Sequence, residues 1–217
     1  MKLSVLILTH NRPELFKRAI NSVLNNLPGY DIEILVNNDT NDINEIYDNR
    51  ISIHYYYFRH DDLSCVYKHL FDLATGEFIY YLEDDDYIKT NFFDCLDLTA
   101  DVNFMEYVSE PLIKEIGPYN SYKKISKSRS IDHKNKTKIF IDQFDDEEFQ
   151  LGQIVFRKKL VDKFPAGNNT YNDYTLFQNI AKCNPTLKYI HEQTWVQTTD
   201  GNDNISFPDF NVDERFC

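Results

Sequence analysis

Short, continuous apolar runs alternate with amphipathic segments at the start of the chain. The run LSVLIL (residues 3–8) precedes PELFKRAINSVLNNL (13–27), in which apolar positions recur at helical spacing after Pro13. The next apolar run is IEILV (32–36). Uninterrupted apolar runs of this length are typical of strands buried on both faces of a parallel sheet. The pattern therefore predicts strand, helix and strand, the unit from which parallel α/β sheets are built.

Two more strands and a helix extend this pattern. ISIHYYYF (51–58) predicts a third strand and FIYYL (78–82) a fourth, and CVYKHLFDLA (65–74) predicts a helix between them, closed by Gly76. Four carboxylates, residues 83–86, follow the fourth strand directly. They are therefore expected at the carboxyl end of a strand in an open α/β sheet, where ligands bind in such folds.

The alternation loosens after residue 90. The elements expected there are helices over 91–98, 158–164 and 173–183, strands over 102–109, 149–157 and 187–199, and a polar loop over 115–138. No internal repeat is present, and no linker would let two halves fold apart. We therefore predict one α/β domain over 1–217, with a central, mostly parallel mixed sheet flanked by helices.

Composition agrees with a globular protein of ordinary size. The 217 residues are 42% hydrophobic, which suits one domain with a large core. No apolar run approaches the roughly 20 residues of a membrane span, and the opening MKLSVLIL is too short and too weakly charged for a signal peptide. The four cysteines form no C-x-x-C pair, which favours reduced thiols. These features predict a soluble, cytoplasmic protein.

Several motifs are missing from the sequence. It contains no G-x-G-x-x-G, no P-loop and no G-x-S-x-G, which argues against a dinucleotide oxidoreductase, a P-loop kinase and a serine hydrolase. The six histidines do not fall in a zinc-ligand spacing such as H-E-x-x-H. The acidic run YYLEDDDYI (80–88) is thus the main candidate for chemistry. Adjacent carboxylates repel one another, so the run is either a solvated loop or a site for a divalent cation.

Three segments occur in a fixed order over the first ninety residues: SVLILTHNRPELFKRAINSVL, DIEILVNNDTND and LATGEFIYYLEDDDYI. They resemble the successive signatures of family 2 glycosyltransferases of GT-A fold. Those signatures are an apolar strand ending in T-x-N-R, a strand ending in V-D-D/N-x-S-x-D, and ATGE-[FY]-[IV]-x-x-L-D-x-D-D. The resemblance implies a single GT-A (Rossmann-like) domain whose residues 1–100 bind a nucleotide sugar and whose residues 101–217 bind the acceptor.

By this resemblance, the acidic run holds Mn²⁺ or Mg²⁺. Glu83 and Asp85 stand at the first and second aspartates of the family's D-x-D element, and Asp85 is expected to bind the metal directly. Glu83, which departs from the family's Asp, is expected near the ribose or at the metal through water. Asp86 would orient its neighbours and contact the nucleotide sugar. Asp84 occupies the variable position, where it contacts the nucleotide sugar or simply faces solvent.

The resemblance also implies a nucleotide pocket at the ends of the first two strands. Its expected residues are Thr9, His10, Asn11 and Arg12 after the first strand, and Asn37, Asn38 and Asp39 after the second. The family usually has an Asp that accepts a hydrogen bond from the base, and an Asn amide can both accept and donate. An ordinary Asx turn remains the alternative for 37–39, and a surface ion pair remains the alternative for Arg12.

The second half is expected to supply the general base. Family members place an E-D pair at the start of a helix, and TYNDYTLFQNIA matches it with Asn172, an acceptor-binding residue, and Asp173, the base. A helix N-cap is the alternative for Asp173. TTDGNDNIS (198–206) resembles R-x-H-G-x-x-x-S, in which Asp200 replaces a metal-binding His. A polar turn around Gly201 is the alternative there.

The implied activity is inverting, metal-dependent transfer of a sugar from a nucleoside-diphosphate sugar, expected to be a UDP sugar. The stretch 122–138 carries seven Lys/Arg against one Asp in a chain of net charge −12. Such a run is either a solvated loop or a binding site for a polyanionic acceptor. In the second case the acceptor-binding residues are Lys123, Lys124, Lys127 and Arg129.

Alternatives remain for the acceptor, the location and the activity. The acceptor is a hydroxymethylated base in phage DNA, or a cell-surface polysaccharide or lipopolysaccharide. The location is accordingly the cytoplasm of a bacterium or of a phage-infected host cell. A catalytically degenerate GT-A domain that binds a nucleotide sugar or a partner protein is the alternative outside enzymes.

Overall fold

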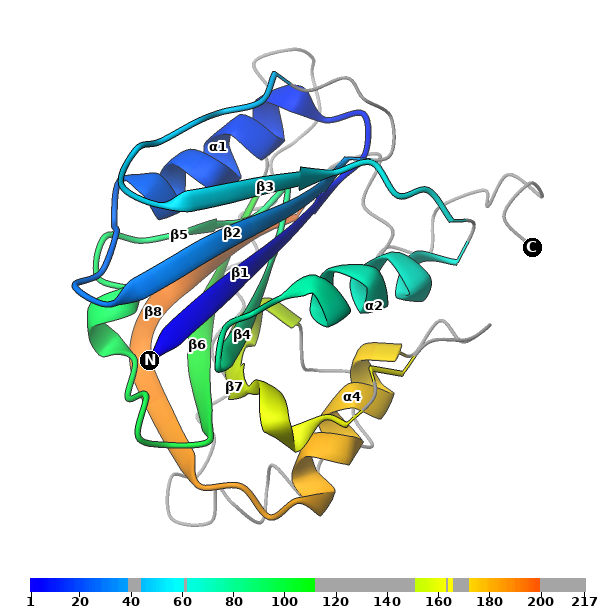
Figure 1. Ribbon diagram of the computed structural model, residues 1–217. Helices are drawn as coiled ribbons and strands as arrows, with labels where there is room; N and C mark the ends of the chain where they lie inside the picture. The colour runs from blue at the N-terminus through cyan, green and yellow to red at the C-terminus, as the bar shows by residue number, and fades with distance from the viewer. Residues whose placement is uncertain (39–43, 61, 112–150, 163, 166–171, 200–217) are drawn as a thin grey trace.

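A mixed β-sheet runs through the molecule. A computed structural model describes residues 1–38, 44–60, 62–111, 151–162, 164–165 and 172–199. These residues form eight strands in the order β3-β2-β1-β4-β7-β6-β8-β5 (Figure 1). The strands are β1 (Lys2–Thr9), β2 (Asp31–Asn38), β3 (Ser52–Tyr56), β4 (Phe78–Glu83), β5 (Tyr87–Ile88), β6 (Val102–Pro111), β7 (Ile154–Arg157) and β8 (Leu187–Thr199).

The sheet is parallel where the sequence predicts βαβ units. Strands β3, β2, β1 and β4 are all parallel neighbours, and β6 pairs in parallel with β8. Strand β7 is antiparallel to both β4 and β6, and β5 is antiparallel to β8. Because β1 and β4 run in parallel, the ends of these strands, where the acidic run begins, meet at one edge of the sheet. The predicted GT-A architecture, a mostly parallel mixed sheet flanked by helices, is confirmed.

Helices cover both faces of the sheet. Helix α1 (Pro13–Leu24) packs on the face to which β1 presents Leu3, Val5 and Ile7. Helices α2 (Leu63–Leu73) and α4 (Asn172–Lys182) pack on the opposite face, where β1 presents Leu6 (Figure 1). Strand side chains alternate between faces, so the continuous apolar runs of the sequence serve two cores. Among the described residues, no helix is both long and apolar enough to cross a membrane.

Three predicted elements differ from the structure. The expected helix over 91–98 is wrong: only a 3₁₀ turn, η1 (Phe93–Cys95), forms there. Asp97 accounts for its early end, because its side chain accepts from the Thr99 N–H at 2.9 Å and its own N–H donates to Asn103 at 2.7 Å.

The other two differences lie at β7. The helix expected over 158–164 is the 3₁₀ turn η4 (Lys158–Leu160), and β7 is preceded by the 3₁₀ turn η3 (Leu151–Gln153) instead of extending back to 149. Strand β5 was not predicted. The three cysteines that the structure describes are free thiols, as expected.

Candidate active site

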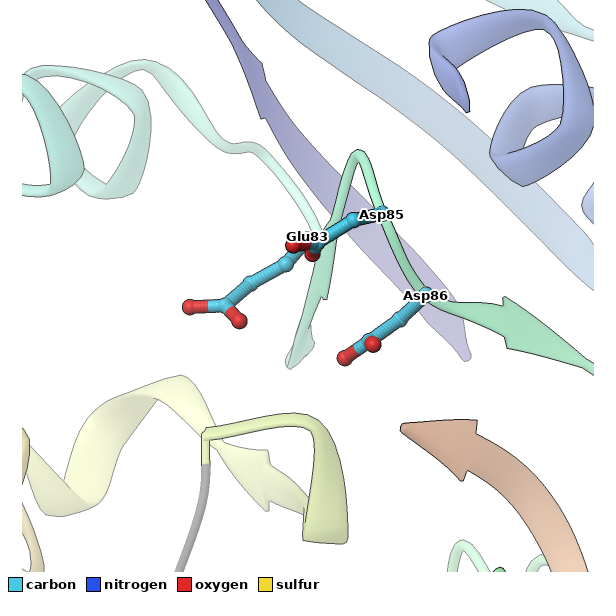
Figure 2. A group of neighbouring side chains, drawn as sticks. All are labelled: Glu83, Asp85 and Asp86. Atoms are coloured by element: carbon cyan, nitrogen blue, oxygen red, sulfur yellow. The ribbon is translucent and has the colours of Figure 1, made fainter. Parts of the chain in front are cut away.

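Three carboxylates converge where β4 ends. The chain reverses after Glu83 in a turn closed by a 3.1 Å hydrogen bond from the Asp86 N–H to the Glu83 carbonyl oxygen. Glu83, Asp85 and Asp86 each offer a carboxylate oxygen, and these oxygens lie within 4.8 Å of one another. Figure 2 shows the three side chains around this turn. A separation this short suits several ligands of one cation.

The turn is buried, which makes its negative charges unfavourable. Burial is the main cause that raises the pKa of Asp86 well above its ordinary value, and the charges of Glu83 and Asp85 raise it further. Burial likewise raises the pKa of Asp85, and it raises the pKa of Asp84 to about 6. Nearby cations and hydrogen-bond donors oppose these shifts and favour the ionised carboxylates.

Arg12 supplies one such cation. Its Nη1 donates to Asp84 Oδ1 at 3.1 Å and to Asp85 Oδ2 at 3.2 Å. The expectation that Asp84 faces solvent is wrong, because the residue is only 5% exposed and it binds this guanidinium. Arg12 follows Asn11, whose φ of 54° lies in the left-handed region that Asn tolerates better than most residues. The chain is thus bent after β1 at the residue that precedes Arg12.

Arg18 supplies a second cation, which the sequence analysis missed. From α1 its Nη2 donates to the main-chain oxygen of Asp85 and, at 2.8 Å, to Thr198 Oγ1 on β8. The Thr198 N–H in turn donates to Asp86 Oδ1 at 2.9 Å. The sequence carried one weak signal for Arg18: a cationic residue on the helix that opens a family-like βαβ unit.

The carboxylates fit a hard divalent cation. Asp86 Oδ2 is buried and has no hydrogen-bond partner among the described residues. Glu83 is only partly buried, and its Oε1 accepts from the Tyr67 hydroxyl of α2 at 3.1 Å. Oxygen-only donors at this spacing suit Mg²⁺ or Mn²⁺. Glu83, Asp85 and Asp86 are therefore the described residues that could hold the metal.

The nucleotide-pocket candidates lie at the same edge of the sheet. Thr9 and Asn38 are register partners at the ends of β1 and β2, and both are buried. Asn37 is engaged by the protein itself: its Nδ2 donates to the Phe58 carbonyl at 2.9 Å and its Oδ1 accepts from the Phe58 N–H at 3.1 Å. His10 and Asn11 are exposed. The strand register places the ends of β1 and β2 at the edge of the sheet where β4 carries the carboxylates, and contacts of these residues with a nucleotide stay predictions.

Several predicted site residues are not placed. Those outside the described residues are Asp39, Lys123, Lys124, Lys127, Arg129 and Asp200. Asn172 and Asp173 form the first turn of α4, as expected, but only their backbone is described. The roles of all these residues therefore stay predictions.

Solved structures of S. aureus TarS share this fold. Residues 1–349 of TarS in complex with UDP-GlcNAc superpose with a TM-score of 0.63 at 16% identity, covering 94% of this chain and 60% of that chain. The complex of the same TarS fragment with UDP gives 0.61 at 18% identity, covering 92% and 61%. This chain thus spans about 60% of the length of those TarS chains. A comparison with curated protein sequences gives no match.

The family model described as glycosyl transferase family 2 matches residues 4–163. The match contains most of β1, all of β2 and β4 and the acidic turn, and it covers most of the chain. The order of segments, the mixed sheet and the carboxylates at the end of β4 agree with it. The chain belongs to glycosyl transferase family 2.

Proposed function

We propose that this protein is an inverting, metal-dependent glycosyltransferase that uses a UDP sugar. The observation that carries the proposal is the group of Glu83, Asp85 and Asp86 at the end of β4 in a chain of glycosyl transferase family 2. The choice of UDP is supported by the similar fold of S. aureus TarS, which has been solved with UDP-GlcNAc and with UDP.

The acidic turn would bind the diphosphate end of the donor. Glu83, Asp85 and Asp86 would hold Mn²⁺ or Mg²⁺, which when bound stabilises the charge of the leaving diphosphate as a Lewis acid. Arg12, which lies against Asp84 and Asp85, would also donate to a phosphate oxygen of the donor. Asp200 is proposed as a further ligand, since it follows by two residues Thr198, whose N–H donates to Asp86.

The transfer itself would need a base beside the acceptor. Asp173, in the first turn of α4, would remove the proton from the acceptor hydroxyl. The hydroxyl oxygen then forms a bond to the anomeric carbon as the bond from that carbon to the diphosphate oxygen breaks. A single displacement of this kind inverts the anomeric configuration. Asn172 would position the acceptor.

Release of UDP from a panel of UDP sugars, with and without Mn²⁺, tests this proposal. We expect slow, Mn²⁺-dependent hydrolysis of one donor even without an acceptor. Asp85→Ala should abolish both release and metal-dependent UDP binding, whereas Asp173→Asn should abolish transfer and leave UDP binding intact. Full transfer by Asp173→Asn would exclude Asp173 as the base. UDP binding without any release would favour a degenerate, binding-only domain.

For the acceptor we propose a polyanion, of which a hydroxymethylated base in DNA is the first candidate. The support is the run of seven Lys/Arg over 122–138 in a chain of net charge −12. A gel shift of hydroxymethylated duplex DNA that weakens steeply with salt would support this acceptor. Loss of the shift in a Lys123, Lys124, Lys127 and Arg129 alanine variant would assign it to this run. No shift at low salt would favour a polysaccharide or lipopolysaccharide acceptor.

A further inference from the structure

Arg18 joins three elements that are far apart in the sequence. It lies on α1, and its Nη2 donates to the main-chain oxygen of Asp85 in the acidic turn and to Thr198 Oγ1 on β8. Its guanidinium carbon also lies 5.0 Å from the centre of the Tyr87 ring on β5. A planar guanidinium can serve two acceptors and stack on a ring at once, which an ammonium group cannot do in the same way.

Thr198 is held from two sides. Its hydroxyl accepts from Arg18, and its N–H donates to Asp86 Oδ1 at 2.9 Å. Both Asp86 and Thr198 are buried. Just before this point β8 pairs with β5, where Val196 is the register partner of Tyr87. The end of β8 and the acidic turn are therefore tied through Arg18 and through Asp86.

These contacts fix the geometry of the carboxylates. The main-chain oxygen that Arg18 binds belongs to Asp85, and the carboxylate that binds Thr198 belongs to Asp86. Asp85 and Asp86 both belong to the carboxylate group at the end of β4. A shift of β8 would thus move Asp86, and loss of the Arg18 contact would release the main chain at Asp85.

We propose that Arg18 is a positioning residue of the metal site. It holds the acidic turn against the end of β8, so that Asp85 and Asp86 keep the spacing at which they bind a cation together. The inference rests on the proposed function, because it gives these carboxylates a metal to bind. Residues that orient metal ligands typically change metal affinity by about 10- to 100-fold when they are removed.

Arg18→Met and Lys17→Met form a matched pair for the test. Each removes one positive charge from α1, and Lys17 is exposed. Titration of the full chain with Mn²⁺ alone, followed by electron paramagnetic resonance, should show about 10-fold or weaker binding for Arg18→Met. Lys17→Met should stay within about twofold of wild type, because Lys17 contacts none of the ligands. Arg18→Lys should lie between Arg18→Met and wild type, since it keeps one charged donor.

A double-mutant cycle with Thr198→Val separates positioning from general stability. Valine removes the hydroxyl that accepts from Arg18 but keeps the N–H that donates to Asp86. We expect the double variant to bind Mn²⁺ little worse than Arg18→Met alone. The reason is that each single change already removes the same contact, the hydrogen bond from Arg18 to Thr198 Oγ1. If Arg18→Met does not fold, the Mn²⁺ affinities of Thr198→Val and Arg18→Lys are compared with that of wild type instead.

Two outcomes would overturn the inference. One is wild-type Mn²⁺ affinity in Arg18→Met with a lower melting temperature, which would leave Arg18 a purely structural role. The other is a wild-type protein that binds no Mn²⁺, whether or not it releases UDP. A wild-type protein that binds Mn²⁺ with the expected Arg18 dependence but releases no UDP from any donor would contradict the proposed function alone.

Discussion

Asp86 shows how a residue can favour binding at the expense of folding. It is 1% exposed, one of its oxygens accepts from the Thr198 N–H, and its other oxygen has no hydrogen-bond partner among the described residues. An ionised carboxylate in this position loses its hydration and lies next to Glu83 and Asp85. The same features favour a divalent cation, which would neutralise the charge and take the remaining oxygen.

Asp86→Asn should therefore make the metal-free protein more stable. The amide oxygen can still accept from Thr198, and the repulsion from Glu83 and Asp85 disappears. Each kcal/mol gained corresponds to about 2–4 °C in melting temperature for a chain of this size. Thermal unfolding in EDTA should show a rise for Asp86→Asn and no rise for Asp31→Asn, an exposed control. A lower melting temperature would mean that the ionised form stabilises the turn.

Asn37 explains a departure from the family pattern. The family usually has Asp there, but this amide both donates to the Phe58 carbonyl and accepts from the Phe58 N–H. An aspartate could make only the second of these hydrogen bonds. Asn37 therefore fixes the chain that follows β3, which a carboxylate could not do equally well.

We expect Asn37→Asp to lower the free energy of unfolding by about 1–3 kcal/mol. The residue is 2% exposed, so the change buries a charge and leaves the Phe58 carbonyl without its donor. Urea unfolding monitored by circular dichroism measures the loss. Asn49→Asp makes the same chemical change at an exposed position and should have little effect. An equal effect of both variants would argue that net charge, not this hydrogen bond, is responsible.

At the scale of elements, a buried polar network ties β1, β2 and the start of β4 at the edge of the sheet opposite the acidic turn. Glu33 forms an ion pair with Lys2 at 2.6 Å and accepts from Ser4 Oγ at 2.5 Å and from the Thr75 N–H at 2.7 Å. Gly76 completes the network by donating to Ser4 Oγ at 2.8 Å. Gly76 was expected to close α2, but the helix ends at Leu73 and the glycine is needed for this close approach.

Gly76→Ala should be destabilising for a steric reason. A Cβ atom there would lie 2.5 Å from Ser4 Oγ and 2.6 Å from the Ser4 nitrogen, so the backbone of β1 or β4 would have to move. Overpacking of this kind costs about 1–3 kcal/mol. Gly29→Ala is the control, because nothing lies within 4 Å of the added atom. Chemical unfolding that gives equal midpoints for the two variants would contradict the close contact.

The Glu33 network should also be sensitive to acid. Burial alone would raise the pKa of Glu33, but the hydrogen bonds from Lys2, Ser4 and Thr75 outweigh it and lower the pKa to about 2. The ionised form is therefore favoured by folding, and its contribution is fully present above the unfolded-state pKa of about 4.3. That contribution is lost as the pH falls from about 4.3 to 2. Urea midpoints of wild type and Glu33→Gln should accordingly differ at pH 6 and converge near pH 2, whereas a constant difference would contradict this assignment.

The sequence predicted most elements because their cores impose simple patterns. Strands β1, β2 and β4 are buried on both faces, so they appear as continuous apolar runs, and α1 appears as an apolar stripe. Strand β5 was missed because it has only two residues and is a strand only through its pairing with β8. No local pattern encodes a partner more than a hundred residues away.

The candidate site was predicted only in part, because local sequence patterns reveal its place in the fold but not its tertiary contacts. The carboxylates at 83–86 follow a strand directly, so their edge of the sheet was predictable from local order. Their individual environments were not, because the burial of Asp84 and the contact of Arg18 with Thr198 arise only when α1, β4 and β8 come together. Such contacts depend on tertiary packing, which spacing along the chain does not reveal.

At the scale of the whole molecule, the acidic turn is a point where several elements meet. The turn follows β4, and it is contacted by Arg12 from the end of β1, by Arg18 from α1 and by Thr198 from β8. A ligand that neutralises the turn would therefore stabilise elements from both ends of the chain. Binding to the folded state alone raises the free energy of unfolding by an amount that grows with ligand concentration.

UDP and Mn²⁺ together should consequently raise the melting temperature more than either does alone. At about 100 times the dissociation constant the gain is about 2.7 kcal/mol, or roughly 5–10 °C for a chain of this size. Mn²⁺ should stabilise weakly by relieving the repulsion between Asp85 and Asp86, and UDP without metal should have little effect because it adds negative charge. Differential scanning fluorimetry measures the three melting-temperature shifts, with Mn²⁺ alone, with UDP alone and with both. Addition of EDTA should reverse the shifts that depend on the metal. Asp85→Asn should lose the joint effect, and a shift with UDP that persists in EDTA would mean that Arg12 and Arg18, rather than a metal, provide the charge that binds the diphosphate.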